Sequence, residues 1–331
     1  MVEVVIKMFK SLSDKIKGKK IPVVFPEAMD PRIQAAVARL KAEDLMVPIL
    51  LGNPEEVLSS AKEKGINLEG IEIMDPNNFA GYDEMVDTFV ELRKGKATKE
   101  QAMTILKDEN YFGTMLVYMN KAAGLVSGAV HSTGDTVRPA LQIIKTKPGI
   151  SLTSGAFVMI RNEGKERYVF ADCAINIAPN AQQLAEIAVE SAKTAKVFDI
   201  EPNVALLSFS TKGSASSPEQ EKVAEATKIA QEMAPELNID GELQFDAAFV
   251  ESVGKQKAPG SPVAGKATVF VFPEIQSGNI GYKIAQRFGN FEAIGPILQG
   301  LNKPISDLSR GCSEEDVYKL AIITANQSLI D

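Results

Sequence analysis

Residues 21–51 read IPVVFPEAMDPRIQAAVARLKAEDLMVPILL, and this stretch decides the fold class. The apolar run Ile21–Phe25 indicates a buried strand, and Met46–Leu51 indicates a second one. Between them, Asp30 followed by Pro31 marks a helix start, because aspartate caps free N–H groups and proline fits the first helical turn. A strand, a helix and another strand in this order are typical of a parallel sheet covered by helices.

The alternation of strands and helices continues along the chain. Asn53 and Pro54 repeat the helix-start pattern, and Ile71–Met74 indicates a third strand. Mostly helical sequence then leads to a strand over Leu125–Val130. That strand runs into the small polar residues HSTGDTVRP (His131–Pro139), which we expect to form a loop before the helical-looking ALQII.

The centre of the chain departs from this pattern. Phe157–Arg161 and Arg167–Ala171 flank the turn residues 162–164 and predict an antiparallel β-hairpin. A second α/β domain is therefore expected to begin near residue 150, packed on the first with a cleft in which ligands bind. Further strands are expected over 204–209, 244–250 and 268–272, and helices over 180–198, 218–233, 279–288 and 313–329.

The composition excludes several classes of protein. The 331 residues suggest about two domains, and 45% hydrophobic with 24% charged residues is ordinary for globular domains. With 36 Lys+Arg against 43 Asp+Glu, the net charge of −7 argues against a nucleic-acid binder. A few arginines can still line a cleft for a phosphorylated ligand.

Histidine and cysteine are scarce, which limits the chemistry. A zinc motif of the HExxH type needs two histidines, and the chain has only His131. Two widely separated cysteines predict neither a CxxC metal site nor a disulfide framework. We therefore expect a cytoplasmic protein whose chemistry uses no metal. The apolar runs are shorter than the ~20 residues of a membrane span, and the first residues lack the apolar core of a signal peptide.

Two segments place small hydroxyl residues and an arginine where an anion can bind. The segment His131–Pro139 follows a strand and contains Arg138, whose guanidinium group suits phosphate oxygens. The segment Ser306–Asp316 places Ser309 and Arg310 just ahead of the last helix, where free N–H groups and the helix dipole favour an anion.

Each segment also has a purely structural explanation. The first can be a polar turn in which the backbone satisfies His131. In the second, Ser313 and Asp316 match a capping box, so Asp316 is structural, catalytic or both. The short patterns alone leave these alternatives open.

Three longer motifs resemble those of the phosphate acetyl/butyryltransferase family. The resemblance extends over essentially the whole chain, in the short form without an N-terminal regulatory extension, and the motifs stand in the family's order. They are HSTGDTVRPALQIIKT (His131–Thr146), LLSFSTKGSA (Leu206–Ala215) and KPISDLSRGCSEEDVYKLAIITANQ (Lys303–Gln327).

The resemblance implies the reaction acetyl-CoA + phosphate ⇌ acetyl phosphate + CoA, in which coenzyme A is a substrate and no cofactor is needed. It also implies a homodimer of chains with two α/β domains around a cleft, isocitrate/isopropylmalate dehydrogenase-like in architecture. Domain I would comprise residues 1–146 plus 302–331 and domain II residues 147–301. The partners would be these small molecules, with no nucleic acid and no membrane.

The resemblance also assigns roles to individual residues. Asp316 would take the proton from the CoA thiol, Ser309 would bond the tetrahedral species, and Arg310 would hold the phosphate. Arg138 and Arg93 would hold phosphates of CoA, and Arg93 lies in the loosest match to the family pattern. The acyl-phosphate pocket would be lined by Ser132 and Thr133.

Three other functions compete with this one. The first is the same mechanism on a propionyl or butyryl group. The second is a ligand-sensing module, like the similar domains fused to malic enzymes. The third is a decarboxylating dehydrogenase of the same general fold, for which the sequence offers neither metal-binding aspartates nor a nicotinamide site.

Overall fold

The computed structural model describes residues 2–330, with side chains from Phe9 onward. These residues divide into two compact units, each built around one sheet. The first unit comprises Phe9–Thr146 and the chain from Leu301 onward, and the second comprises Lys147–Gly300 with residues 2–8. The chain therefore returns to the first unit for its last strand and helix.

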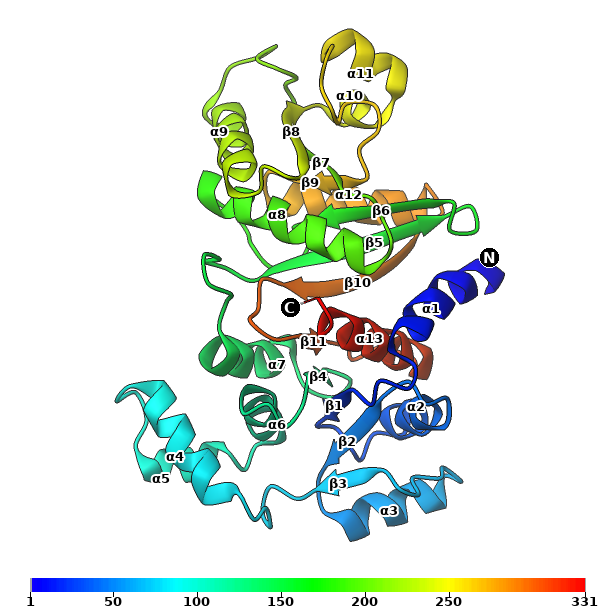
Figure 1. Cartoon of the computed structure of the whole chain (residues 1–331), viewed down its shortest axis with the longest axis vertical. Helices are drawn as coiled ribbons and strands as arrows, with labels where there is room; N and C mark the ends of the chain where they lie inside the picture. Colours follow the sequence, from blue (N-terminus) through cyan, green and yellow to red (C-terminus); the bar gives the residue numbers. More distant parts are fainter. Residues whose placement is uncertain (1, 331) are drawn as a thin grey trace. The chain divides into compact units, whose positions relative to one another are not determined.

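The first unit holds a five-stranded, fully parallel sheet in the order β11-β4-β1-β2-β3 (Figure 1). The strands are β1 (Pro22–Phe25), β2 (Val47–Leu51), β3 (Glu72–Met74), β4 (Gly124–Ser127) and β11 (Ile305–Asp307). Helix α1 (Val2–Ile16) belongs to this unit from Phe9 onward. The other helices of the unit are α2 (Pro31–Ala42), α3 (Pro54–Glu63), α4 (Tyr82–Arg93), α5 (Lys99–Ile105), α6 (Glu109–Tyr118), α7 (Thr133–Pro139), the π-helical turn η1 (Ala140–Ile144) and α13 (Glu314–Gln327).

The strand–helix–strand pattern of residues 21–51 is confirmed. Asp30 caps α2 by accepting a hydrogen bond from the backbone N–H of Arg32 at 2.8 Å, and Pro31 stands in the first turn. The apolar face of α2 is fully buried, for example at Ile33 and Val37. Figure 1 shows α2 and α13 on one side of this sheet and α6 and α7 on the other.

The expected loop over His131–Pro139 is wrong. Strand β4 ends at Ser127, and helix α7 begins at Thr133 because Ser132 and Asp135 form a capping box. In it, the N–H of Asp135 bonds the Ser132 hydroxyl at 3.3 Å, and the N–H of Ser132 bonds the Asp135 carboxylate at 3.2 Å. Small polar residues suggest a loop, but here they supply both halves of a helix cap.

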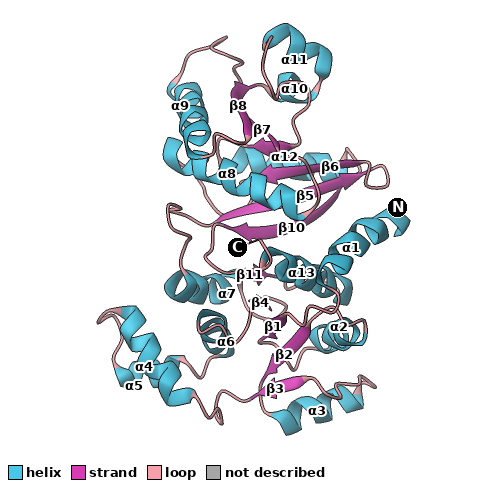
Figure 2. Ribbon diagram, in the orientation of Figure 1, coloured by secondary structure: helices cyan, strands magenta, loops and turns pink. Residues whose placement is uncertain are grey.

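The second unit holds a mixed six-stranded sheet in the order β10-β5-β6-β9-β7-β8. The strands are β5 (Ser154–Arg161), β6 (Glu166–Ala171), β7 (Asn203–Leu207), β8 (Asn238–Leu243), β9 (Val269–Val271) and β10 (Glu292–Gln299). The helices are α8 (Ala181–Val197), α9 (Pro218–Met233), α10 (Phe245–Phe249), α11 (Glu251–Lys257) and α12 (Ile275–Arg287). Figure 2 shows α8 in front of this sheet and α12 behind it.

The predicted hairpin is confirmed as the antiparallel pair β5 and β6, in which Arg161 lies opposite Glu166. Strand β10 also pairs antiparallel with β5, and the sequence patterns did not predict it. The remaining pairs in this sheet are parallel. No helix within residues 2–330 has the length and apolar character needed to cross a membrane.

The strand expected over Gln244–Val250 is wrong, because Phe245–Phe249 is helical. A short apolar run is compatible with the periodicity of a helix and with that of a strand. The rings of Phe245 and Phe249, four residues apart, stack with their centroids 5.6 Å apart. The strand lies earlier, at β8, where the sequence contains two acidic residues. Those residues are buried with partners: Asp240 pairs with Lys212, and Glu242 accepts a hydrogen bond from Ser210 at 3.0 Å.

Candidate active site

The candidate site lies in the first unit, where the carboxyl ends of β1, β4 and β11 meet at one edge of the parallel sheet. Ligands of open α/β sheets bind at this edge, because loops and helix N-termini converge there. Residues 26–30 connect β1 to α2, residues 128–132 connect β4 to α7, and residues 308–313 connect β11 to α13. The segments singled out in the sequence therefore occupy neighbouring loops.

Ser309, Arg310 and Asp316 share the loop and first turn that join β11 to α13. All three side chains are exposed. The Ser309 hydroxyl accepts a hydrogen bond from the N–H of Gly311 at 3.3 Å, and its carbonyl accepts one from the N–H of Cys312 at 2.9 Å. These bonds make the loop a tight turn that presents Ser309 and Arg310 together.

Asp316 completes the capping box of α13. Its Oδ2 accepts hydrogen bonds from the N–H and the hydroxyl of Ser313, both at 2.8 Å. The prediction that Asp316 has a structural role as part of a helix cap is therefore confirmed. Because the side chain is exposed, a catalytic role is compatible with the cap.

Ser132 and Thr133 start α7 in the adjacent loop, and both are exposed. The Ser132 hydroxyl donates to Asp135 at 2.7 Å. Burial raises the pKa of Asp307, the last residue of β11, and the hydroxyls of Thr133 and Thr136 oppose that rise. The β4–α7 loop therefore touches the strand that leads into the Ser309 loop.

Arg138 in α7 and Arg93 in α4 belong to the same unit, and the charge of each acts on the pKa of Tyr111. Burial raises the pKa of the Tyr111 phenol, and the positive charges of Arg138 and Arg93 oppose the rise, so both arginines act on one ring. Arg138 is exposed in the last turn of α7, and Arg93 is half-buried at the end of α4. The Tyr111 hydroxyl donates to Gln142 at 3.1 Å. Tyr111 was not identified from the sequence, because an isolated tyrosine on a helix gives no pattern.

Two further charged residues at this edge were missed by the sequence reasoning: Glu27 and Arg32. Glu27 is buried and accepts hydrogen bonds from four consecutive backbone N–H groups, those of residues 128–131, at 2.7–3.1 Å. Arg32 donates to all three site loops. One signal was available for Arg32, since an arginine in a helix's first turn opposes the helix dipole and needs another reason to be there.

Glu27 also holds His131, whose Nδ1 lies 2.9 Å from its carboxylate. Burial works against ionisation of Glu27, but hydrogen bonds from His131 and the loop backbone outweigh it and lower its pKa. The hydrogen bond to Glu27 raises the pKa of His131, and partial burial opposes the rise. The expectation that the backbone satisfies His131 is corrected, because its ring partner is a carboxylate.

This pair predicts a measurable titration. Since His131 is the only histidine, one imidazole resonance reports it. Its pKa should lie above the ordinary value of about 6.5, and Glu27→Gln should lower it. A raised folded-state pKa means that protonated His131 adds stability below the ordinary pKa, and this is lost as pH rises through the folded-state value. Proton NMR against pH measures both variants. Glu55→Gln, which removes an exposed carboxylate of α3, is the control, and an unshifted His131 in Glu27→Gln contradicts the assignment.

The two cysteines offer no activated nucleophile. Cys173 and Cys312 are both free and buried. Burial raises the pKa of the Cys312 thiol, Arg32 opposes the rise and Asp316 adds to it. A raised pKa keeps the thiol protonated and unreactive near neutral pH. Among the residues described, no three His, Cys, Asp or Glu side chains gather as metal ligands would.

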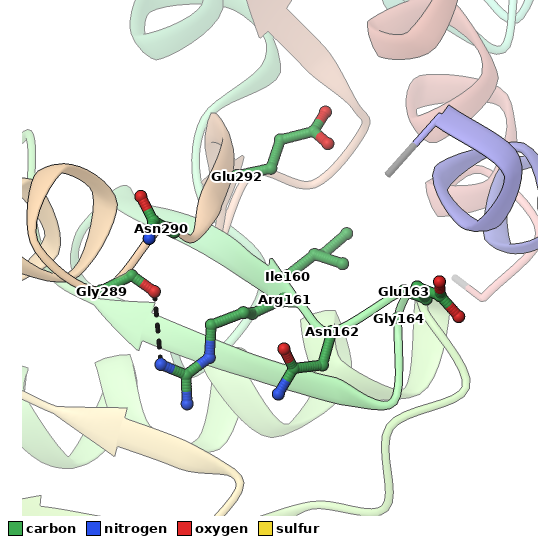
Figure 3. Close-up of a pocket in the computed structure, with 8 residues that line it drawn as sticks. All are labelled: Ile160, Arg161, Asn162, Glu163, Gly164, Gly289, Asn290 and Glu292. Atoms are coloured by element: carbon green, nitrogen blue, oxygen red, sulfur yellow. Dashed lines mark hydrogen bonds between the residues drawn. The ribbon is translucent and has the colours of Figure 1, made fainter.

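A surface pocket of about 560 Å³ lies in the second unit, at the tip of the β5–β6 hairpin (Figure 3). Its one arginine, Arg161, is already engaged: it pairs with Glu166 at 2.5 Å and donates to the carbonyl of Gly289 at 3.2 Å. None of the predicted site residues lines this pocket. The lining residues are Ile160, Arg161, Asn162, Glu163, Gly164, Gly289, Asn290 and Glu292.

Comparison with known proteins gives consistent matches over almost the whole chain. A model of the family "Phosphate acetyl/butaryl transferase" matches residues 7–325. The phosphate acetyltransferase of Bacillus subtilis (strain 168) is 63% identical over 97% of this chain and 99% of its own. That of Staphylococcus epidermidis (strain ATCC 12228) is 60% identical over 96% of this chain and 98% of its own. The crystal structure of a phosphotransacetylase from Streptococcus pyogenes matches with a TM-score of 0.96 at 62% identity, covering 98% of this chain and 99% of that chain.

Proposed function

The chain belongs to the phosphate acetyl/butaryl transferase family, and on this premise we propose that it transfers an acetyl group directly between coenzyme A and phosphate. The observation that carries the proposal is 63% identity to a phosphate acetyltransferase across 97% of the chain. The chain is thus an acyltransferase, and the sensing-module and dehydrogenase alternatives lose their support. The residues at the carboxyl edge of the first unit's sheet carry both steps of the proposed transfer.

In the first step Asp316 acts as the base. A free thiol with a pKa near 8.5 is only partly ionised at neutral pH, so a positioned carboxylate increases the reactive fraction. Asp316 takes the proton of the CoA thiol, and the resulting thiolate sulfur attacks the carbonyl carbon of acetyl phosphate. A C–S bond forms, and the carbonyl electron pair moves to oxygen. The exposure of Asp316 supports this role, because substrate can reach it.

In the second step the tetrahedral species collapses. Ser309 donates a hydrogen bond to the oxyanion, and Arg310 holds the phosphate whose bridging oxygen leaves carbon. The C–O bond breaks, the proton held by Asp316 passes to the leaving oxygen, and the products are acetyl-CoA and hydrogen phosphate. Fixed donors aimed at developing charge contribute about 3–4 kcal/mol each in such transfers. The tight Ser309–Cys312 turn supports this pairing of Ser309 with Arg310.

The other predicted residues bind substrate in this proposal. Arg93 and Arg138 contact phosphates of CoA, and their common neighbourhood at Tyr111 supports treating them as one anion-binding pair. Ser132 and Thr133 line the acyl-phosphate pocket, supported by their exposed position in the loop next to Ser309. The acyl group is acetyl, and no protein cofactor takes part.

Architecture and assembly beyond the two α/β units stay predictions. They comprise the dehydrogenase-like cleft, the homodimer and the cytoplasmic location. For the homodimer, support comes from exposed apolar side chains one turn apart on and just after α12. They are Ile280, Ile284 and Phe288, of which Phe288 is 87% exposed.

The acyl group is tested by comparing kcat/KM for acetyl, propionyl and butyryl phosphate with CoA as acceptor. We expect acetyl phosphate to be preferred, by about 10-fold or more for each added methylene, because a close-fitting pocket rejects extra volume. Equal or higher kcat/KM for butyryl phosphate would favour the longer-acyl alternative. Absence of thioester with all three donors would contradict acyl transfer itself.

A further inference from the structure

We infer that Arg32 is a positioning residue of acyl transfer, whose guanidinium group fixes the backbone that carries Ser309 and Arg310. The inference rests on the proposed function, since it concerns the same site. Arg32 itself need not touch substrate. It lies in the first turn of α2, the helix that follows β1, and β1 is the middle strand of the five.

Every donor of Arg32 is used. Nε and Nη2 bond the two oxygens of Asp30 at 3.0 and 2.8 Å. Nη1 bonds the carbonyl of Arg310 at 2.9 Å and that of Cys312 at 3.0 Å, and Nη2 also bonds the carbonyl of Ala129 at 2.7 Å. A guanidinium group has five N–H donors in a rigid fork, and here all five are directed at oxygens from the three site loops.

Through its bond to the Ala129 carbonyl, Arg32 ties the Ser309 loop to a second loop that is itself held in place. The loop containing Ala129 is held by Glu27, whose side chain is only 2% exposed and accepts the four N–H groups of residues 128–131. Hydrogen bonds to a charged acceptor are about twice as strong as neutral ones. Arg32 therefore connects the loop of Ser309 and Arg310 to the rigid start of the Ser132 loop.

The pairing with Asp30 explains only part of the placement of Arg32, because three of its five bonds go to carbonyls outside α2. Asp30 and Pro31 already start α2, and a cation in the first turn opposes the helix dipole. Arg39, two turns later, is the contrasting case. It stands in the last turn, where the dipole favours a cation, pairs with Glu43 and Glu315, and bonds none of the site loops.

A shift of the Arg310 carbonyl would displace the side chain that holds the phosphate. Displacing a reacting group by about 1 Å can lower the rate about 100-fold. Lysine cannot replace Arg32, because an ammonium group has three donors without the planar fork. The expected signature of Arg32 variants is a fall in kcat while the protein remains folded.

The test is a double-mutant cycle with acetyl-CoA formation as the readout. We expect Arg32→Gln and Arg32→Lys each to lower kcat about 100-fold, with thermal midpoints close to that of Arg39→Gln, the matched control, which should keep its rate. In an Arg310→Ala background, Arg32→Gln should lower the rate only about tenfold or less, because one of the two side chains that it positions is gone. A purely structural role would give the same loss in both backgrounds.

The outcomes separate this inference from the function on which it rests. If the wild type makes acetyl-CoA and Arg32→Gln keeps its rate, the inference is wrong and the function stands. Full activity of Arg32→Lys also overturns it, because charge alone would then suffice. If Arg32→Gln fails to fold, Arg32→Lys decides alone, through the same cycle. If the wild type makes no acetyl-CoA, the proposed function has failed first.

Discussion

Replacing Asp316 by asparagine should lower kcat for acetyl-CoA formation about 10²–10⁴-fold, the usual contribution of a general base. Asparagine cannot accept the thiol proton at neutral pH. Its side-chain oxygen can still accept the two hydrogen bonds from Ser313 that hold the capping box, which in the native chain are both 2.8 Å long. The variant should therefore stay folded, with helix α13 intact.

This substitution is informative because it removes the proposed role of Asp316 as a base and keeps its role in the helix cap. Steady-state kinetics and thermal unfolding of Asp316→Asn are compared with those of Glu219→Gln. This control removes a carboxylate from the first turn of α9, outside the site. It should lose a similar, small amount of stability and no activity. If Asp316→Asn keeps near-native kcat, Asp316 only caps its helix. A Ser313→Ala variant, which removes the cap hydroxyl but leaves the carboxylate, should lose about 1 kcal/mol of stability.

Replacing Arg310 by glutamine should lower kcat/KM for acetyl phosphate about 10²–10³-fold, because a fixed charge at the leaving phosphate is lost. The Arg310 side chain is exposed, and only its backbone carbonyl is bonded, to Arg32. Folding should therefore be unaffected. Arg310→Lys should recover part of the loss, since it keeps the charge but not the two-pronged contact with phosphate oxygens.

Arg39→Gln is the control for this substitution too, as it removes the same charge from a residue that contacts α13 without bonding the Ser309 loop. The rates are measured over a range of acetyl phosphate concentrations at fixed CoA, and over a range of CoA concentrations at fixed acetyl phosphate. A variant that loses affinity for CoA but not for acetyl phosphate would contradict the assignment of Arg310 to the transferring phosphate. It would place this arginine with Arg93 and Arg138 instead.

The local signals in the sequence were reliable where one short-range interaction decides the structure. Asp30 and Asn53 cap their helices as expected, and Ser313 forms the predicted box with Asp316. The strand expected over residues 244–250 failed because period alone cannot separate a short helix from a strand. Strand β8 was missed because its acidic residues are buried with partners, such as Lys212, that lie far away in the sequence.

The residues of the candidate site likewise fall into those that a local motif reveals and those that only the folded chain brings together. Ser309, Arg310 and Asp316 are close in sequence, so one motif contains them. Glu27 and Arg32 act on loops about 100 and 280 residues away, at separations of 101–104 and 278–280 positions. Such contacts exist only once the parallel sheet brings β1, β4 and β11 together, and no local pattern encodes them.

The most direct test of the account is to incubate the purified protein with acetyl phosphate and labelled phosphate, with and without CoA. Direct attack by the thiolate predicts acetyl-CoA formation when CoA is present, with one phosphate released per thioester. Without CoA, it predicts no label in acetyl phosphate and no acetyl group on the protein. Exchange of label into acetyl phosphate without CoA, or a stable acetylated protein that passes its acetyl group to CoA, would contradict it.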